Sequence, residues 1–489
     1  MNCSDFNIKI VYTGDIHGRF LYDEINKSVG ASRLGGYVSD LRTSRKNILL
    51  VDTGDLLHGE TMVTTSRGDA AVRLFNLIGY DYLVPGNHDF NYGYQRLIKL
   101  SRAMKAKVLA ANIIFSNGKF LFKQNDTVKI DGKRIGIFGL TTPETAIKTN
   151  PKNIEGITFL DPVRVADEQV KKLREKEVDL IIAITHLGVD NESFGHRSYD
   201  VRDKVLGIDL IIDGHSHTEL KKIRQTPAAA QIVSAGAYLE YVGVVGISII
   251  NGQKIITPKS IHFDDLKSQR PDMALEKVIV NISKKIAHLL DKIVGESRVY
   301  LEGKKSAVRT RETHLTKIIT DAVLKETGAD LVFLNGGSFR SSINSGSITM
   351  NDVLSVSPFN NFIVTKKIKG LNILKMLEWG LDKYPSPTGS FPQISGMYCA
   401  FDDKAKAGRR VKIIRIGDLP IDYTKEYTVA TNDFIAHGGD GYKVVKDSLE
   451  AGEYSGLNEI VANYLPSISP ITRDDLPPRI VCIARLNKM

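Results

Sequence analysis

The sequence has little cysteine and lacks the marks of a membrane-spanning or exported chain. Its 489 residues hold three cysteines, Cys3, Cys399 and Cys482, without a CxxC pair, so nothing in them requires an oxidising compartment. No window approaches about 18 uninterrupted apolar residues, which excludes a transmembrane helix. The N-terminus lacks the basic start and apolar core of a signal peptide. We expect a cytoplasmic protein from the sequence as written, with a periplasmic or secreted location as the alternative for a chain trimmed to its mature form.

The composition is that of a globular protein with a basic excess. At roughly 150 residues per domain, this length predicts two to four domains, each able to bury a core. Charged residues make up 25% and hydrophobic residues 42% of the chain, which excludes disorder and collagen. Lysine and arginine exceed aspartate and glutamate by 66 − 56 = 10. This excess fits a nucleic acid, a phosphorylated small molecule, an acidic membrane surface, or simply scattered surface lysine.

The first half of the chain repeats one pattern, in which a short β-branched run ends in a turn that holds Asp, Asn or His. Amphipathic segments such as 161–176 separate several of the runs, which cover residues 8–13, 48–52, 82–85, 106–110, 135–139, 180–185 and 210–213. Strands that alternate with helices predict α/β layers. Ligands of such folds bind where the strands end, and the polar residues of this sequence gather at those ends.

A long helix is predicted between two domains. Apolar residues recur at helical spacing through 271–295, at Leu275, Val278, Ile282, Ile286, Leu289 and Ile293. The sequence then restarts with a helix near 311–327, a strand at 330–334 and the Gly- and Ser-rich loop NGGSFRSSINSGS. We therefore expect an N-terminal domain over 1–266, a linker helix within 267–298 and a C-terminal domain over 299–489.

Five short motifs at predicted strand ends carry metal-ligand chemistry. They are TGDIHG with Asp15 and His17, VDTGD with Asp55, PGNHDF with Asn87 and His88, ITHLG with His186, and DGHSHT with His215 and His217. Each fragment alone is more typical of a turn residue or of a core histidine than of a metal ligand. Together they hold five of the 11 histidines of the chain in four such turns. Mixed carboxylate, amide and imidazole ligands suit Zn, Mn, Fe, Co or Ni better than Ca or Mg, and a pair of such ions bridged by one carboxylate promotes in-line attack on phosphorus.

The order of these motifs resembles that of the calcineurin-like metallophosphoesterases, and the whole chain resembles the two-domain 5′-nucleotidase family. The resemblance implies a four-layer metallophosphoesterase sandwich, a linking helix and a C-terminal α/β nucleotide-binding domain. It also implies one metal held by Asp15, His17, Asp55 and His217, and a second held by Asp55, Asn87, His186 and His215. Asp55 would bridge two divalent ions, with Zn or Mn expected before Fe, Co or Ni.

His88 belongs to the same motif, but the resemblance implies a place near the phosphoryl group and not on a metal. There it can stabilise the transition state or assist the leaving oxygen. The family's 5′-nucleotidases usually orient this ring with an aspartate three residues later, where this chain has Asn91. A neutral amide positions the ring without supporting its positive charge. GNHDFNYG resembles the variant in the 2′,3′-cyclic-nucleotide phosphodiesterase/3′-nucleotidase branch, which keeps that activity as the alternative.

The second half holds arginines and phenylalanines in small-residue loops. An arginine such as Arg340 in NGGSFR can grip phosphate or carboxylate with two nitrogens, and two facing rings can sandwich a base. Taken singly, such residues are more typical of a core or of a solvated surface than of a substrate site. NGGSFR, SPFNNF, FPQISG and NDFIAHGGDGY resemble the 5′-nucleotidase C-terminal domain over about residues 300–445. The resemblance implies that Phe359 and Phe434 clamp the base with support from Asn361, that Asn335 and Asp440 contact the ribose or base side, and that Arg311 and Arg340 contact the sugar-phosphate side.

The leading hypothesis is a metal-dependent 5′-nucleotidase that acts on nucleotides and nucleotide sugars. The cyclic phosphodiesterase and an inactive nucleotide-binding protein stay as alternatives. The family's usual Gly-Asn after the first arginine is replaced by Thr316-Lys317, which predicts a reshaped arginine pocket. The expected partner is a nucleotide, not a polymeric nucleic acid, because no basic helix or stacked-base channel is evident. The sequence leaves the oligomeric state open.

Overall fold

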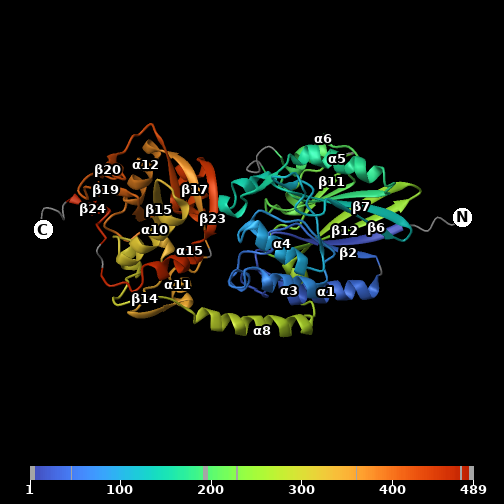
Figure 1. The fold of residues 1–489 in the computed structure, drawn as a ribbon, viewed down its shortest axis with the longest axis horizontal. Coiled ribbons are helices and arrows are strands. Elements are labelled where there is room, and N and C mark those ends of the chain that lie inside the picture. The colour runs from blue at the N-terminus through green and yellow to red at the C-terminus, as the bar shows by residue number, and fades with distance from the viewer. Residues whose placement is uncertain are drawn as a thin grey trace. The chain divides into compact units, whose positions relative to one another are not determined.

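The computed structural model describes residues 6–45, 47–190, 196–226, 229–359, 361–473 and 476–483. The chain divides between Ile286 and Ala287 into two compact units, called unit 1 and unit 2 below (Figure 1). Cys399 and Cys482 are free and buried in unit 2, and Cys3 lies outside the described residues. Among the residues described, no helix has both the length and the apolar character needed to cross a membrane.

Unit 1 is built on two larger sheets. The six-stranded sheet has the order β13-β12-β1-β2-β3-β4, with strands Gln253–His262, Tyr241–Ile250, Phe6–Thr13, Ile48–Asp52, Tyr82–Leu83 and Lys107–Val108. The five-stranded sheet has the order β11-β10-β9-β7-β6, with strands Gln231–Ser234, Leu210–Asp213, Leu180–His186, Lys133–Thr141 and Asn125–Ile130. A separate pair joins β5 (Ile113–Phe115) to β8 (Ile157–Phe159).

The two sheets pack face to face under outer helices. Ile8 and Ile10 of β1 share one buried cluster with Ile137 of β7 and Ile182 of β9, so apolar faces of both sheets form a common core. The outer face of the five-stranded sheet packs against α5 (Pro162–Arg174) and α6 (Ser198–Lys204). Helices α1 (Gly30–Ser44) and α3 (Asp69–Ile78) lie on the opposite side of unit 1 (Figure 1). The predicted four-layer sandwich is confirmed.

The parallel strands of each sheet end at the same level. Thr13 of β1 pairs with Asp52 of β2, while Thr141 of β7 pairs with His186 of β9 and Thr185 pairs with Asp213 of β10. The turns after these strands therefore meet at one edge of the sandwich. The expected strands 82–85 and 106–110 are shorter than predicted, with two residues each in β3 and β4.

Short elements complete unit 1 between the strands. Its remaining helices are α2 (Thr61–Thr64), η1 (His88–Phe90), α4 (Tyr94–Ala103), η2 (Pro143–Ala146), η3 (Pro151–Asn153), η4 (Leu220–Lys222) and α7 (Phe263–Leu266). The predicted helix 161–176 is α5, which begins after Asp161 because this side chain accepts a hydrogen bond from the backbone nitrogen of Arg164.

The predicted linker helix is α8, and it is shorter than the apolar spacing suggested. It covers Met273–Leu290, with Leu275, Ile279, Ile282 and Ile286 buried along one face. The prediction extended it to residue 295, which is wrong. Ile293 begins strand β14 (Ile293–Ser297), which pairs antiparallel with β16 (Gly346–Thr349). The backbone of this segment is hydrogen-bonded to a strand that is distant in sequence, and the local spacing of apolar residues gives no information about such a partner.

Unit 2 is built on a mixed sheet covered on both faces. Its order is β18-β15-β22-β17-β23, with strands Pro392–Ser395, Leu331–Asn335, Glu426–Asn432, Phe362–Lys369 and Leu449–Gly456. Val332 and Leu334 face the core that holds α10 (His314–Thr327), α11 (Met350–Val356) and α15 (Leu457–Tyr464). Leu331 and Phe333 face the core of α12 (Gly370–Gly380). Alternate side chains of one strand thus reach opposite layers.

The remaining elements of unit 2 are short. A smaller sheet has the order β21-β20-β19-β24, with strands Leu419–Pro420, Val411–Ile416, Met397–Phe401 and Ile480–Cys482. The other helices are α9 (Lys305–Val308), η5 (Gly336–Ser338), α13 (Asp433–Ala436), η6 (Gly439–Gly441), α14 (Lys443–Lys446) and η7 (Leu465–Ser467). Helix α10 begins three residues later than the expected Arg311, because the Thr313 hydroxyl caps it by accepting from the backbone nitrogen of Thr316.

Candidate metal centre

The five sequence motifs converge in unit 1. Their potential ligand atoms form three overlapping groups, and within each group all of these atoms lie within 4.8 Å of one another. The groups are Asp15, His17 and His217; His17, Asp55 and His88; and Asp55, His186 and His215. Asp55 belongs to two groups, as a bridging carboxylate would. The groups therefore bring together six of the seven ligands that the sequence assigned to two neighbouring metals, and the seventh, Asn87, contacts His186.

The first predicted ligand set is joined by contacts between its rings and carboxylates. The Nε2 atoms of His17 and His217 are 3.1 Å apart, and His217 Nε2 lies 3.6 Å from Asp15 Oδ1. His17 Nε2 lies 3.7 Å from Asp55 Oδ2. Two imidazole nitrogens at this separation from each other and from carboxylate oxygens point to a common centre, which is the geometry a cation would occupy.

His186 occupies the middle of the second predicted set. Its Nδ1 lies 2.6 Å from the carbonyl oxygen of Thr53, and because a carbonyl only accepts, the proton is on Nδ1. Nε2 then faces Asp55 Oδ2 at 3.3 Å and Asn87 Oδ1 at 3.2 Å. A backbone carbonyl that fixes the tautomer of a histidine in this way is typical of metal ligands.

The backbone at the site is held in an uncommon conformation. Five predicted ligands have positive φ values in the left-handed region, which are 51° for Asp15, 48° for His17, 55° for Asp55, 79° for His215 and 51° for His217. Only a few per cent of non-glycine residues adopt this conformation, because it brings the β-carbon close to the backbone, and such residues are concentrated at functional sites. The site also leaves no room for a side chain at Gly86, since a β-carbon there would lie 2.2 Å from Asp55 Oδ1 and 2.6 Å from His186 Cε1.

The charges of the site fit a divalent cation. Burial raises the pKa of Asp15 well above its usual value, and the neighbouring Asp55 carboxylate raises it further. Burial also disfavours ionised Asp55, but the His186 and His88 imidazoles outweigh it and hold the pKa of Asp55 well below its usual value. Although burial lowers the pKa of His186, the carboxylates of Asp55 and Asp15 raise it to about 10. Buried carboxylates thus draw a positive charge to this site, and a metal ion could supply it.

His88 belongs to one of the three ligand groups, although the sequence did not assign it to a metal, and it is held by its neighbours. Its backbone nitrogen donates to Asp55 Oδ1 at 2.9 Å, and its ring lies 5.1 Å from that of His17, centroid to centroid. Burial is the main reason that the pKa of His88 falls to about 3. The Asn91 amide nitrogen approaches His88 Nδ1 at 3.2 Å, so Asn91 does contact this ring as the sequence predicted.

Sequence reasoning missed two carboxylates that hold the ligands. Asp89 accepts four backbone hydrogen bonds, from Asp55, Leu56, Leu57 and Gly86, at 2.7–3.0 Å. Glu144 Oε2 lies 2.9 Å from His215 Nε2, which leaves the other ring nitrogen of His215 for a metal. The available signals were the position of Asp89 within PGNHDF and that of Glu144 just after the predicted strand 135–139.

His58 was also missed. This buried ring lies nearly parallel to that of His88, with centroids 6.3 Å apart and an interplanar angle of 17°. The His58 ring also contacts the Tyr92 ring, with a distance of 5.1 Å between the two centroids. Because it follows the VDTGD motif by three positions, the carboxyl end of the predicted strand 48–52 was the signal that could have drawn attention to it.

Unit 2 presents the two predicted clamp phenylalanines to solvent. Phe359 is 45% exposed and Phe434 is 47% exposed, so neither is a core residue. Asp433 links the segments that carry them, because it accepts hydrogen bonds from the Asn361 side chain and from the backbone nitrogen of Phe434. Asn361 thus supports the Phe434 turn, and Asp433 is a further residue that sequence reasoning missed.

The polar residues predicted for the substrate each contact a neighbouring side chain. Asn335 ends β15 and donates to Asp440 Oδ2 at 2.7 Å. The Arg340 guanidinium carbon lies 4.7 Å from the centre of the Phe359 ring, in a cation–π arrangement. Arg311 pairs with Glu302 at 2.6 Å. Lys317, which stands in the pair that differs from the family's usual Gly-Asn, is buried and donates to the carbonyl oxygen of Leu476.

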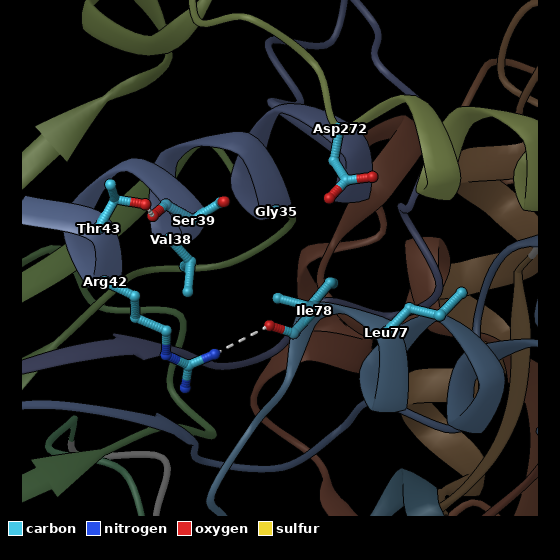
Figure 2. A pocket seen from close by; sticks show the side chains of 8 residues that line it. All are labelled: Gly35, Val38, Ser39, Arg42, Thr43, Leu77, Ile78 and Asp272. Carbon is cyan, nitrogen blue, oxygen red and sulfur yellow. Dashed lines mark hydrogen bonds between the residues drawn. The ribbon is translucent and has the colours of Figure 1, made fainter.

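A groove of about 330 Å³ in unit 1 contains none of the predicted site residues. It lies between α1 and α3, with Val38, Arg42, Ile78 and Asp272 on its walls (Figure 2). The Arg42 guanidinium donates to the carbonyl oxygens of Ile78 and Gly79, so this arginine ties α1 to the C-terminal end of α3. The groove therefore lies where Arg42 holds two packed helices together.

Two family models match the chain. Residues 8–219 match the calcineurin-like phosphoesterase model, and residues 293–447 match the model of the 5′-nucleotidase C-terminal domain. The first match contains every predicted metal ligand, and the second contains every predicted substrate residue.

Relatives and a solved structure share both units. The mouse 5′-nucleotidase is 27% identical over 500 residues, which cover 91% of this chain and 85% of that protein. The trifunctional nucleotide phosphoesterase protein YfkN of Bacillus subtilis is 29% identical over 91% of this chain, which spans 32% of that longer protein. The crystal structure of a 5′-nucleotidase precursor from Thermus thermophilus is 28% identical and covers 98% of this chain and 99% of its own, with a TM-score of 0.58.

Proposed function

Because the chain belongs to the two-domain 5′-nucleotidase family of calcineurin-like phosphoesterases, we propose that it hydrolyses the 5′-phosphate of nucleotides. The proposed substrate class extends to nucleotide sugars, whose diphosphate linkage offers a phosphorus atom for the same in-line attack. The main support is the set of three overlapping ligand groups, two of which contain Asp55. A metal pair bridged by one carboxylate is suited to attack at phosphorus.

The proposed cofactors are two divalent ions, with Zn or Mn first and Fe, Co or Ni next, on the basis of the mixed oxygen and imidazole ligands. Asp15, His17, Asp55 and His217 would hold one ion, and Asp55, Asn87, His186 and His215 the other. Such ions neutralise phosphoryl oxygens and make a water molecule nucleophilic near neutral pH. The Thr53 carbonyl and the Glu144 carboxylate orient His186 and His215 for this purpose.

His88 is proposed to stabilise charge on the phosphoryl or leaving oxygen, since it adjoins the ligand cluster without belonging to the predicted ligand sets. In unit 2, Phe359 and Phe434 would stack on the base, which suits a site that accepts several bases. Asn335 and Asp440 would contact the ribose side. Arg340 and Arg311 would contact the sugar-phosphate side, as their guanidinium groups allow.

A phosphate-release assay tests the proposal. The purified chain, loaded with Mn or Zn, is given AMP, 3′-AMP, 2′,3′-cyclic AMP, UDP-glucose and p-nitrophenyl phosphate, and the nucleotide products of the cyclic nucleotide and of UDP-glucose are separated and measured along with free phosphate. We expect kcat/KM for AMP to exceed that for 3′-AMP and the cyclic nucleotide by at least about 10-fold, a difference of about 1.4 kcal/mol in the barrier. The converse preference would replace the proposal with the cyclic phosphodiesterase, which the 5′-nucleotidase relatives do not favour. Nucleotide binding without phosphate release would indicate an inactive binding protein.

A further inference from the structure

Residues just after β7 hold Asn91 in place beside His88. The Thr149 hydroxyl is buried and donates to Asn91 Oδ1 at 2.9 Å. Asn153 Nδ2 donates to the backbone carbonyl oxygen of Asn91 at 2.9 Å. Asn91 is thus fixed at its side chain and its backbone by a segment about 60 positions later in the chain, and Asn91 itself is buried.

The contact with Thr149 determines which end of the Asn91 amide faces His88. In the described part of the chain, Asn91 Oδ1 is the acceptor that this hydroxyl uses. If the amide were turned around, its NH₂ group could still donate to the hydroxyl oxygen, but the buried hydroxyl proton would lose its acceptor, which is unfavourable in a buried site. The orientation with Oδ1 toward Thr149 and Nδ2 toward His88 satisfies both neighbours.

The Asn91 orientation in turn determines the His88 tautomer. An amide nitrogen only donates, and Nδ2 lies 3.2 Å from His88 Nδ1, so Nδ1 must accept and cannot carry a proton. A neutral imidazole with a bare Nδ1 carries its proton on Nε2. An aspartate at position 91 would have the opposite effect, because a carboxylate draws the proton to Nδ1.

We infer that Thr149 is a positioning residue, which acts through Asn91 to hold His88 as a neutral donor with its proton on Nε2. This inference rests on the proposed phosphohydrolase function. His88 then stabilises the developing charge by a hydrogen bond and keeps its proton, because a neutral imidazole is a poor acid, and the departing alkoxide takes its proton from solvent water. A nucleoside alkoxide needs this stabilisation more than a p-nitrophenolate, which leaves with little assistance.

Kinetics with two leaving groups test the inference. We expect Thr149→Val, which keeps the shape and removes the hydroxyl, to lower kcat for AMP by about 10-fold and kcat for p-nitrophenyl phosphate by less than about 3-fold. Thr149→Ser should restore kcat for AMP, since it keeps the hydroxyl. Thr145→Val is the matched control, because Thr145 is buried in the same segment and its hydroxyl donates to the Thr142 carbonyl oxygen. Equal losses on both substrates, or no loss, would overturn the inference.

Nitrogen-15 NMR of the zinc-loaded protein tests the tautomer directly, with the His88 signals assigned by their absence in His88→Gln. We expect Nδ1 unprotonated and Nε2 protonated in the unmodified chain, and a proton on Nδ1 in Asn91→Asp. A protonated Nδ1 or a bare Nε2 in the unmodified chain would overturn the inference, even if Thr149→Val does not fold. If the chain releases no phosphate from any substrate, the proposed function fails, whereas the NMR result still decides the tautomer.

Discussion

The Asp89 carboxylate accepts a hydrogen bond from the backbone nitrogen of Asp55 at a distance of 3.0 Å. The same carboxylate also accepts from Leu56, Leu57 and Gly86. The turn after β2 and the turn after β3 are therefore joined through one buried side chain. Asp55 is aimed at the cluster by a residue two positions beyond Asn87, so two motifs that are separate in the sequence act together.

Asp89→Asn should destabilise unit 1. The amide keeps one oxygen for two of the backbone donors, but its NH₂ group faces the other two and leaves them without an acceptor. We expect a loss of about 2–4 kcal/mol in the free energy of unfolding, measured by urea denaturation. Asp167→Asn is the control, because Asp167 forms an exposed ion pair with Lys171, which is worth less than about 1 kcal/mol. Equal stabilities of the two variants would contradict the role of Asp89.

Asp55→Asn should remove the bridge between the two proposed ions. An amide has no negative charge, so it cannot serve two cations as a carboxylate does. We expect the bound metal, measured by elemental analysis after desalting, to fall below two ions per chain, and phosphate release to fall by more than about 100-fold. Chelation of the unmodified protein should lower its melting temperature, because bound ions stabilise the folded state. A full metal complement in Asp55→Asn would refute the bridging assignment.

Phe434→Ala should weaken nucleotide binding selectively. Base stacking on an aromatic ring contributes about 1–3 kcal/mol, so KM for AMP should rise by about 5- to 150-fold. KM for p-nitrophenyl phosphate, whose small ring needs no clamp, should change by less than about 3-fold. Tyr423→Ala is the control, because Tyr423 is 48% exposed in the same unit and lies outside the predicted substrate residues. Parallel increases for both substrates would count against base stacking.

Asp126 should make unit 1 sensitive to acid. Burial would raise the pKa of this carboxyl, but hydrogen bonds from Lys107, Lys123 and Tyr82 outweigh it and lower the pKa to about 2. Since the folded-state pKa lies below the unfolded value of 3.8, the stabilisation is complete above about pH 4 and disappears as the pH falls toward 2.

Asp126→Asn tests this dependence. Because the two lysine side chains are 55% exposed and water screens their charges, we expect the unmodified chain to exceed the variant by about 1 kcal/mol at pH 6. This difference should vanish near pH 2. Urea unfolding at pH 6, 4, 3 and 2 measures it, and a difference that does not vary over this range would contradict the pKa shift.

The elements could be predicted from the sequence wherever the residues of one strand or helix are sufficient to specify it. The runs at 8–13, 48–52, 180–185 and 210–213 are strands β1, β2, β9 and β10, because buried β-branched runs specify strands locally. Ile293 was placed in a helix because its spacing fits one, but pairing with Thr349 makes it a strand residue. The local period carries no information about a partner strand.

The residue types of the site and their placement after strands can be read from the sequence. Parallel strands that end together bring such turns to one edge, so Asp15, Asp55 and His186 can be grouped from the sequence. Which atoms of these residues face one another, and what holds them there, depends on the three-dimensional fold. Asp89, Glu144 and Thr149 act through hydrogen bonds to backbone or to another side chain, which depend on distances across the fold and leave no spacing pattern in the sequence.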